Sequence, residues 1–241
     1  MDLDGLRRTI ALGCRILAAR GLAEDVLGHV SARIDDDHVL VRCRGPQERG
    51  LLFTTADDVR LVDLRRPAED DDGYAPPNEL PIHAEALAAR PDTQAVVHAH
   101  PPQVVAADLA GVPFPPMVGA YNIPAARLAR DGIPVYPRGV LISTADLGRE
   151  MMAAMGDRPV CVLRGHGVTT VGATVEQAVV NALVVDSLAA MALRVVHAGG
   201  RPAPLPDADL DALPDLGTGF NDALLWHHHA ARLEHAGLGL P

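Results

Sequence analysis

A short apolar run that ends in two histidines constrains the fold of this chain more than any other stretch. The run is Ala95-Val96-Val97-His98-Ala99-His100. Successive side chains of a β-strand point to opposite faces, so His98 and His100 share one face. Two imidazoles on one face, at the end of a strand, can be adjacent ligands of a divalent metal. Alone, the pair is equally compatible with polar residues on a half-exposed strand.

Two further stretches supply what a metal centre still needs. His166 lies in Arg164-Gly165-His166-Gly167, where the glycines allow a tight turn that brings an imidazole close to another backbone. Glu79 lies in Pro77-Asn78-Glu79-Leu80, nineteen positions before His98 and at the start of an expected helix. It can be a metal ligand or a proton carrier. The alternatives are an ordinary turn with an exposed histidine and a glutamate that simply favours a helix N-terminus.

Three neutral imidazoles leave coordination positions open, which is typical of a catalytic rather than a structural metal site. Imidazole ligands suit Zn²⁺, Fe²⁺, Co²⁺ or Mn²⁺. Such a site acts as a Lewis acid on a bound carbonyl or phenol oxygen and stabilises an enolate-like intermediate. Glu79 is the candidate that moves the proton. We interpret His83, on the helix that follows Glu79, as a structural or solvated residue.

Helical and strand periodicities alternate along the chain, which predicts an α/β protein. With 241 residues, we expect one domain over residues 1–241 with a C-terminal helical extension from about residue 200. Proline-rich loops are expected at 113–118 and 121–124. The expected helices cover 3–20, 80–90, 101–111, 144–155, 174–197 and a last segment around Trp226. The expected strands cover 28–34, 39–43, 51–54, 61–64, 96–100, 133–136, 160–163 and 168–171.

The composition excludes several classes of partner. The formal net charge is -10 and there is no run of basic residues, which argues against nucleic acid and anionic membranes. Aromatic residues make up only 3%, too few for a platform on which bases stack. The first residues lack the pattern of a signal peptide, and no apolar run is judged long enough to cross a membrane. We therefore expect a cytoplasmic protein that acts on a small molecule.

Taken in order, these motifs resemble the class II aldolase/adducin family, and the resemblance spans roughly residues 5–200. The matching motifs are Gly28-x-x-Ser31-x-Arg33, Glu79, Ala95 to Pro101, and Gly165-His166-Gly167 with Gly172 and Glu176. The resemblance implies a three-layer α/β/α sandwich around a mixed, largely antiparallel sheet. It also implies a homotetramer with active sites between subunits.

For the site, the resemblance assigns one divalent metal ion per subunit to His98, His100 and His166, with Zn²⁺ or Mn²⁺ favoured. It assigns the acid-base role to Glu79. Tyr121, in Gly119-Ala120-Tyr121, is a candidate catalytic residue that reaches the site of a neighbouring subunit; the alternative is that it anchors its own loop.

The departures from the family pattern bear on the substrate. In the family's sugar-phosphate enzymes, small polar groups cradle the phosphate: an asparagine after the first glycine, a Thr-Pro-Ser-Gly-like turn, and paired serines before the glutamate. Here the corresponding positions hold His29, Thr54-Thr55-Ala56-Asp57 and Pro77-Asn78. The phosphate cradle is largely missing, and the adjacent Asp57 and Asp58 would repel a dianion.

The stretch from Arg44 to Thr54 resembles instead the branch that decarboxylates ortho-hydroxy aromatic acids, such as dihydroxyphthalate and hydroxypyridine dicarboxylate. We therefore predict a metal-dependent carbon–carbon lyase of aromatic catabolism that removes a carboxylate without oxidation. Arg44 and Arg49 are candidates to bind a second carboxylate, since a guanidinium matches it with two hydrogen bonds. A salt-bridged surface turn is an equally good interpretation of these two arginines. His29, Ser31 and Asn78 are further candidates for substrate binding.

Three other functions remain open from the sequence. One is an aldolase acting on a hydroxy-carbonyl compound, phosphorylated or not, which would release an aldehyde. Another is a non-haem iron oxygenase using the same histidines, which would consume oxygen. The last is a non-enzymatic interaction module of the adducin type. That module should lack the metal ligands, and all of them are present here.

Overall fold

A mixed β-sheet forms the middle layer of the molecule. In the computed structural model, which describes residues 2–68, 70 and 72–240, it has seven strands in the order β3-β2-β1-β4-β7-β6-β5. Neighbouring strands run antiparallel except β5 and β6, which are parallel. The strands are β1 (His29–Arg33), β2 (His38–Arg42), β3 (Val59–Asp63), β4 (Ala95–Ala99), β5 (Val135–Tyr136), β6 (Val160–Leu163) and β7 (Gly167–Gly172).

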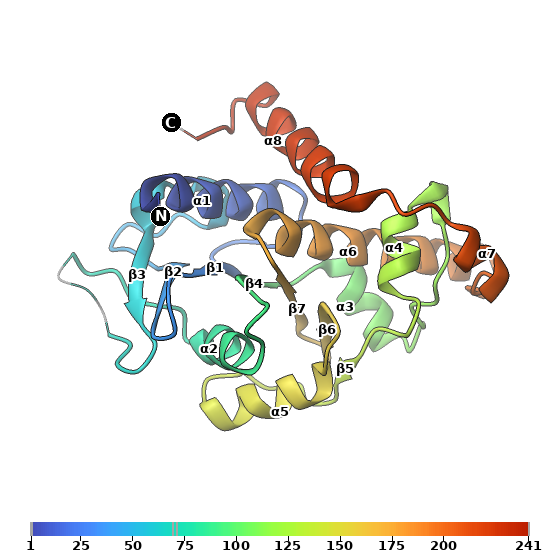
Figure 1. Ribbon diagram of the computed structural model, residues 1–241, viewed down its shortest axis with the longest axis horizontal. Coiled ribbons are helices and arrows are strands. Elements are labelled where there is room, and N and C mark those ends of the chain that lie inside the picture. The colour runs from blue at the N-terminus through green and yellow to red at the C-terminus, as the bar shows by residue number, and fades with distance from the viewer. Residues whose placement is uncertain (1, 69, 71, 241) are drawn as a thin grey trace.

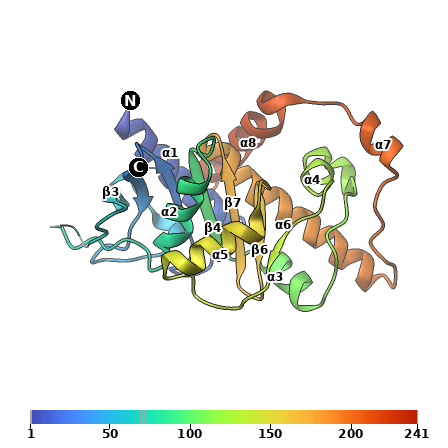
Figure 2. The ribbon, with the colours of Figure 1, turned by 60° about the horizontal axis from the view of Figure 1, so that its bottom comes forward.

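Helices cover both faces of the sheet, which confirms the expected three-layer α/β/α sandwich (Figures 1 and 2). The alternation of side chains in β4 divides the core, because Val97 packs with one group of helices and Val96 with the other. One face carries α1 (Leu3–Ala19), α3 (Pro102–Leu109) and α6 (Val175–His197), with α8 (Leu225–His235) outside them. The opposite face carries α2 (Leu80–Ala89) and α5 (Ala145–Met155).

Two helix starts follow from the sequence as expected. The side-chain oxygen of Thr144 accepts a hydrogen bond from the backbone N–H of Leu147 at 3.3 Å, and α5 begins at the next residue. Thr174 caps α6 in the same way, with Gln177 as the donor at 3.1 Å. A threonine oxygen at this position satisfies an N–H that has no partner within the helix.

The segment predicted as a strand over 51–54 is not one. Gly50 has a φ of +89°, and the chain then makes a short 3₁₀ helix, Leu51–Phe53. Leu51 is fully buried, and the turn that contains it packs against α1. The segment therefore does not pair with a strand of the sheet. A second 3₁₀ turn, Ala56–Asp58, leads into β3. Such a short apolar run does not distinguish a strand from a turn.

Helical turns also occur where loops were expected. The chain forms a 3₁₀ turn, Gly119–Tyr121, and then α4, Ile123–Leu128, whose first turn is capped by the side chain of Asn122. Beyond residue 200 come α7, Asp207–Ala212, and a π-helical segment, Gly219–Leu224, that runs directly into α8.

The expectation that no apolar run is long enough to cross a membrane needs correction at α6. This helix has 23 residues and a mean hydropathy of 1.9 in its most apolar window, sufficient by length and composition alone. Half of that window is buried inside the protein, and α6 packs against α1, α3, β4 and β7. A central core helix satisfies the same criteria.

Candidate metal centre

The ends of three neighbouring strands bring the predicted ligands to one edge of the sheet. His98 is the fourth residue of β4, and His100 follows the strand directly. On one side, His29 of β1 lies opposite His98. On the other side, β7 begins at Gly167, one residue after His166, and Val168 pairs with Ala99 of β4. Residues remote in sequence therefore meet where β4 ends.

Two glycines allow the turn that carries His166 to approach β4 closely. Gly165 has a φ of +61°, a left-handed conformation that glycine adopts without strain. A Cβ atom on Gly167 would lie 2.3 Å from the carbonyl oxygen of Ala99 and 2.8 Å from the ring of His100. Only glycine fits there, and the contact places the ring of His166 beside that of His100. The glycine pattern around His166 therefore has a steric cause.

The three imidazoles form a nearly equilateral triangle. Ring centroids are 4.8 Å apart for His98 and His100, 4.9 Å for His98 and His166, and 4.9 Å for His100 and His166. The Nε2 atoms of His98 and His100 are 2.9 Å apart. Glu79, the residue before α2, directs Oε2 to within 3.2 Å of Nε2 of His98 and 3.6 Å of Nε2 of His166. One ligand atom from each of these four residues lies within 4.8 Å of the others.

Backbone hydrogen bonds fix the orientation of two of these side chains. Nδ1 of His98 donates to the carbonyl oxygen of Val168 at 3.1 Å, and a carbonyl only accepts. Nδ1 therefore carries a hydrogen, and Nε2 is the atom of His98 that faces the cluster and can bind a metal. Oε1 of Glu79 accepts the backbone N–H of Ile142 at 3.0 Å, which leaves Oε2 facing the imidazoles.

Burial sets the charge state of the cluster. Burial lowers the pKa of His100 to about 3, and it also lowers the pKa of His166, so both rings are neutral near pH 7. Burial alone would raise the pKa of Glu79, but the hydrogen bond and charge interaction with His98, together with the Ile142 N–H, lower it to about 2. Neutral imidazoles and an ionised carboxylate are the donor set of a divalent cation. The residues present fit a divalent metal.

The structure adds a residue that the sequence reasoning set aside. His83 is fully buried, and its Nε2 lies 2.6 Å from Nδ1 of His29. Its Nδ1 lies 2.6 Å from the hydroxyl oxygen of Ser31. The signal was available, because Glu79 and His83 are four residues apart and share one face of a helix. His83 is neither solvated nor independent of the site.

The candidates for substrate binding differ in where they lie. His29 is 5% exposed, and its ring centroid is 5.0 Å from that of His98. Ser31 has no exposed surface and lies behind His83, so it does not face the open side of the cluster. Asn78 is exposed directly before Glu79. Tyr121 is 71% exposed and makes no hydrogen bond or ring contact with the cluster within the described part of the chain.

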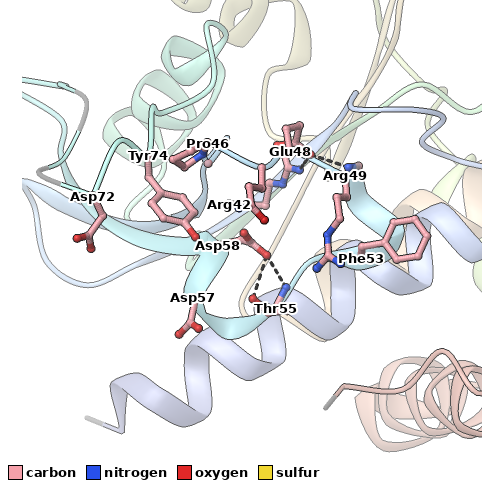
Figure 3. Close-up of a pocket in the computed structure, with 13 residues that line it drawn as sticks. Arg42, Pro46, Glu48, Arg49, Phe53, Thr55, Asp57, Asp58, Asp72 and Tyr74 are labelled. Atoms are coloured by element: carbon pink, nitrogen blue, oxygen red, sulfur yellow. Dashed lines mark hydrogen bonds and ion pairs between the residues drawn. The ribbon is translucent and has the colours of Figure 1, made fainter.

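The two candidate arginines lie in different surroundings. Arg44 is half-buried and forms an isolated β-bridge with Ala75, four residues before Glu79, and its guanidinium has no side-chain partner among the described residues. Arg49 lines a pocket of about 460 Å³ together with Asp57, Asp58 and Asp72 (Figure 3). Its guanidinium lies 5.8 Å from the centre of the Phe53 ring. Of the two arginines, Arg44 is therefore the one whose backbone pairs with the segment leading to Glu79.

The fold and the four-residue cluster define a class of protein. The sequence profile of the Class II Aldolase and Adducin N-terminal domain matches residues 8–193, and the chain belongs to this family. An aldolase II superfamily protein from Pseudomonas syringae has the same fold, with a TM-score of 0.79 and 21% identity over 98% of this chain and 94% of that one.

Among characterised proteins, the chain is similar to aromatic-acid decarboxylases. It is 58% identical to the 3,4-dihydroxyphthalate decarboxylase of Arthrobacter keyseri, over 96% of this chain and 95% of that one. It is 50% identical to the 3,4-dihydroxyphthalate decarboxylase of Rhodococcus jostii, over 96% and 97%. The predicted class is confirmed: the protein is an enzyme of the lyase type, grouped with decarboxylases of hydroxylated aromatic acids.

Proposed function

We propose that this protein removes one carboxylate from an ortho-hydroxy aromatic dicarboxylate of the dihydroxyphthalate type, without oxidation. The observation that carries the proposal is the cluster of three imidazoles and one ionised carboxylate where β4 ends. It is supported by the identity of 58% to a decarboxylase of that substrate. We further propose one Zn²⁺ or Mn²⁺ per subunit, and a cytoplasmic, single-domain chain with a helical extension from about residue 200.

In the proposed reaction, His98, His100 and His166 would hold a divalent ion, which would supply Lewis-acid stabilisation of the negative charge that develops on the substrate. Ionised Glu79 accepts the proton of that hydroxyl. The bond between ring and carboxylate then breaks, its electron pair stays on the ring carbon, and carbon dioxide leaves. Glu79 returns its proton to that carbon, so a C–H bond replaces the C–C bond and the atoms and charges balance.

We assign the remaining substrate carboxylate to Arg44, with Arg49 as a second, more distant cation. The Arg44 guanidinium has no side-chain partner among residues 2–68, 70 and 72–240, and its backbone pairs with the segment that leads to Glu79, so we assign it a carboxylate bound with two hydrogen bonds. Arg49 shares its pocket with three aspartates, which weaken its attraction for an anion.

Replacing Arg44 by glutamine is expected to raise KM for a dicarboxylate roughly 10- to 100-fold, the effect of losing a charge-assisted hydrogen bond. Steady-state kinetics measure it, and kcat should change less because the reacting carbon stays in place. Arg65→Gln is the matched control, since Arg65 is 74% exposed and pairs with Asp37. An unchanged KM in the Arg44 variant would remove this residue from the substrate site.

We also propose that the active enzyme is a homotetramer in which Tyr121 acts in the site of a neighbouring subunit. Ala120 and Tyr121 both have positive φ angles, 54° and 61°. Strained backbone at non-glycine residues is concentrated at functional positions. Together with the exposure of the ring, this conformation suits a side chain presented outward.

Mixed oligomers test this assignment. Tyr121→Phe and His98→Ala homo-oligomers should each be inactive or nearly so. Co-expressed with different tags, the two chains should recover about a quarter of wild-type activity if each site combines residues from two subunits at random. Hetero-oligomers that form without any recovery would place Tyr121 outside the neighbour's site.

The assay that tests the proposed function is carbon dioxide release from a panel of ortho-hydroxy aromatic mono- and dicarboxylates, with ring absorbance followed in parallel. We expect release from dihydroxyphthalate-type acids, and a chelator should stop it. Metal-loaded protein that releases none across the panel would refute the proposal. Aldehyde from a hydroxy-carbonyl compound would then indicate an aldolase, and oxygen uptake by the ferrous protein would indicate an oxygenase.

A further inference from the structure

A buried row of hydrogen-bonded side chains runs behind the metal ligands and ends beside His98. Ser31 of β1 contacts His83 of α2 at 2.6 Å, and His83 contacts His29 of β1 at 2.6 Å. Ser31 and His83 are fully buried, and His29 is 5% exposed. The reaction described above uses none of the three, although the centroid of the His29 ring is only 5.0 Å from that of His98.

The row leaves one polar atom of His29 available. Its Nδ1 is occupied by His83, whereas no residue in the described part of the chain hydrogen-bonds its Nε2. His29 lies directly opposite His98 in the β1–β4 pair, at the sheet edge where the cluster is assembled. His83 and Ser31, which do not themselves reach the metal centre, therefore hold the Nε2 atom of His29 beside that centre.

Within the described part of the chain, no acidic side chain hydrogen-bonds to a ring of this row. Glu79, one helical turn before His83, directs its oxygens to Ile142 and to His98 and His166. A buried imidazolium without a hydrogen-bonded carboxylate would be costly, so the row consists of neutral rings. A neutral ring suits a neutral substrate group better than a second carboxylate, which we have assigned to Arg44.

We propose that His29 forms a hydrogen bond with a second ring hydroxyl of the substrate. His83 and Ser31 are the positioning residues that hold the His29 ring in place. This inference rests on the proposed decarboxylase function. The second hydroxyl is the one beside the hydroxyl that is ortho to the leaving carboxylate. The site is thereby selective for vicinal dihydroxy aromatic acids over monohydroxy ones.

The tautomers of the row favour a hydroxyl. If Ser31 donates to His83, then His83 donates to His29, and Nε2 of His29 carries a hydrogen. If Ser31 accepts, the order reverses, and Nε2 presents a lone pair. A hydroxyl both donates and accepts, so it pairs with His29 in either arrangement, whereas a carboxylate pairs only with the first.

The test compares kcat/KM for two acids that differ only in the second hydroxyl, both retaining the hydroxyl next to the leaving carboxylate. We expect the wild-type enzyme to prefer the dihydroxy acid at least about tenfold, the ratio for one hydrogen bond. His29→Leu should bring the ratio close to one while metal content stays unchanged. His38→Leu is the control, because His38 is half-exposed at the opposite end of the neighbouring strand β2.

Variants of Ser31 and His83 distinguish an effect on substrate preference, through the position of His29, from a general loss of protein stability. Ser31→Ala and His83→Leu should each reduce the preference, and His83→Gln should restore much of it, since its amide can replace the contact to His29. An unchanged preference in His29→Leu, or in Ser31→Ala where His29→Leu does not fold, would overturn the inference. Absence of carbon dioxide from either acid with the wild-type enzyme would instead overturn the proposed function.

Discussion

His98→Ala is expected to lose bound metal and decarboxylase activity together. His98 is fully buried, its Nε2 lies 2.9 Å from Nε2 of His100, and its orientation is fixed by Val168. With the ion lost, the site loses Lewis-acid stabilisation worth several kcal/mol, so activity should fall about a thousandfold or more. Metal analysis of the purified protein and carbon dioxide release measure the two effects.

His38→Ala provides the matched control, because this half-exposed histidine pairs with Asp35 away from the cluster. It should keep full metal content and activity. Circular dichroism of His98→Ala should show that the sheet and helices persist. A folded His98→Ala protein that retains metal and turnover would place the metal centre elsewhere.

Glu79→Gln is expected to keep the metal and lose turnover by about 10²- to 10⁴-fold, the usual contribution of a positioned proton carrier. Glutamine can still accept the Ile142 N–H, and the three imidazoles are untouched. It cannot accept the proton of the ring hydroxyl. Metal content and single-turnover carbon dioxide release measure the two quantities separately.

The control for Glu79→Gln lies on the same helix. Glu85 contacts Arg149 at 3.5 Å on the side of α2 that faces α5, and Glu85→Gln should be fully active. If Glu79→Gln lost metal as well as turnover, Glu79 would be a ligand as much as a proton carrier. Full activity would contradict the acid-base assignment.

The clustering of the three histidines was predictable because the signals for it are local. The two-residue spacing of His98 and His100 requires only that the stretch be a strand, and the glycines around His166 indicate a tight turn. The cap residues Thr144 and Thr174 also act within one helical turn. Features of this kind depend on neighbours in sequence, so a single chain displays them.

Other features depend on contacts between distant segments. The Ile142 N–H that orients Glu79 comes from a loop 63 residues further along the chain, and no local pattern indicates it. His83 was missed because its importance lies in contacts with His29 and Ser31 on another element. The 51–54 stretch was misread because tertiary packing against α1 decided the conformation of a short apolar run.

The way the ligands are distributed along the chain has a consequence for stability. Glu79, the His98–His100 pair and His166 come from three separate segments, and 66 positions separate His100 from His166. An unfolded chain holds these groups far apart, so it competes poorly for the ion. An ion bound at the proposed centre would link β4 and β7 across their junction and would add about 2.7 kcal/mol to the free energy of unfolding when free metal is at a hundred times its Kd. Metal supply would then govern how long the folded enzyme survives heat, as well as how fast it turns over.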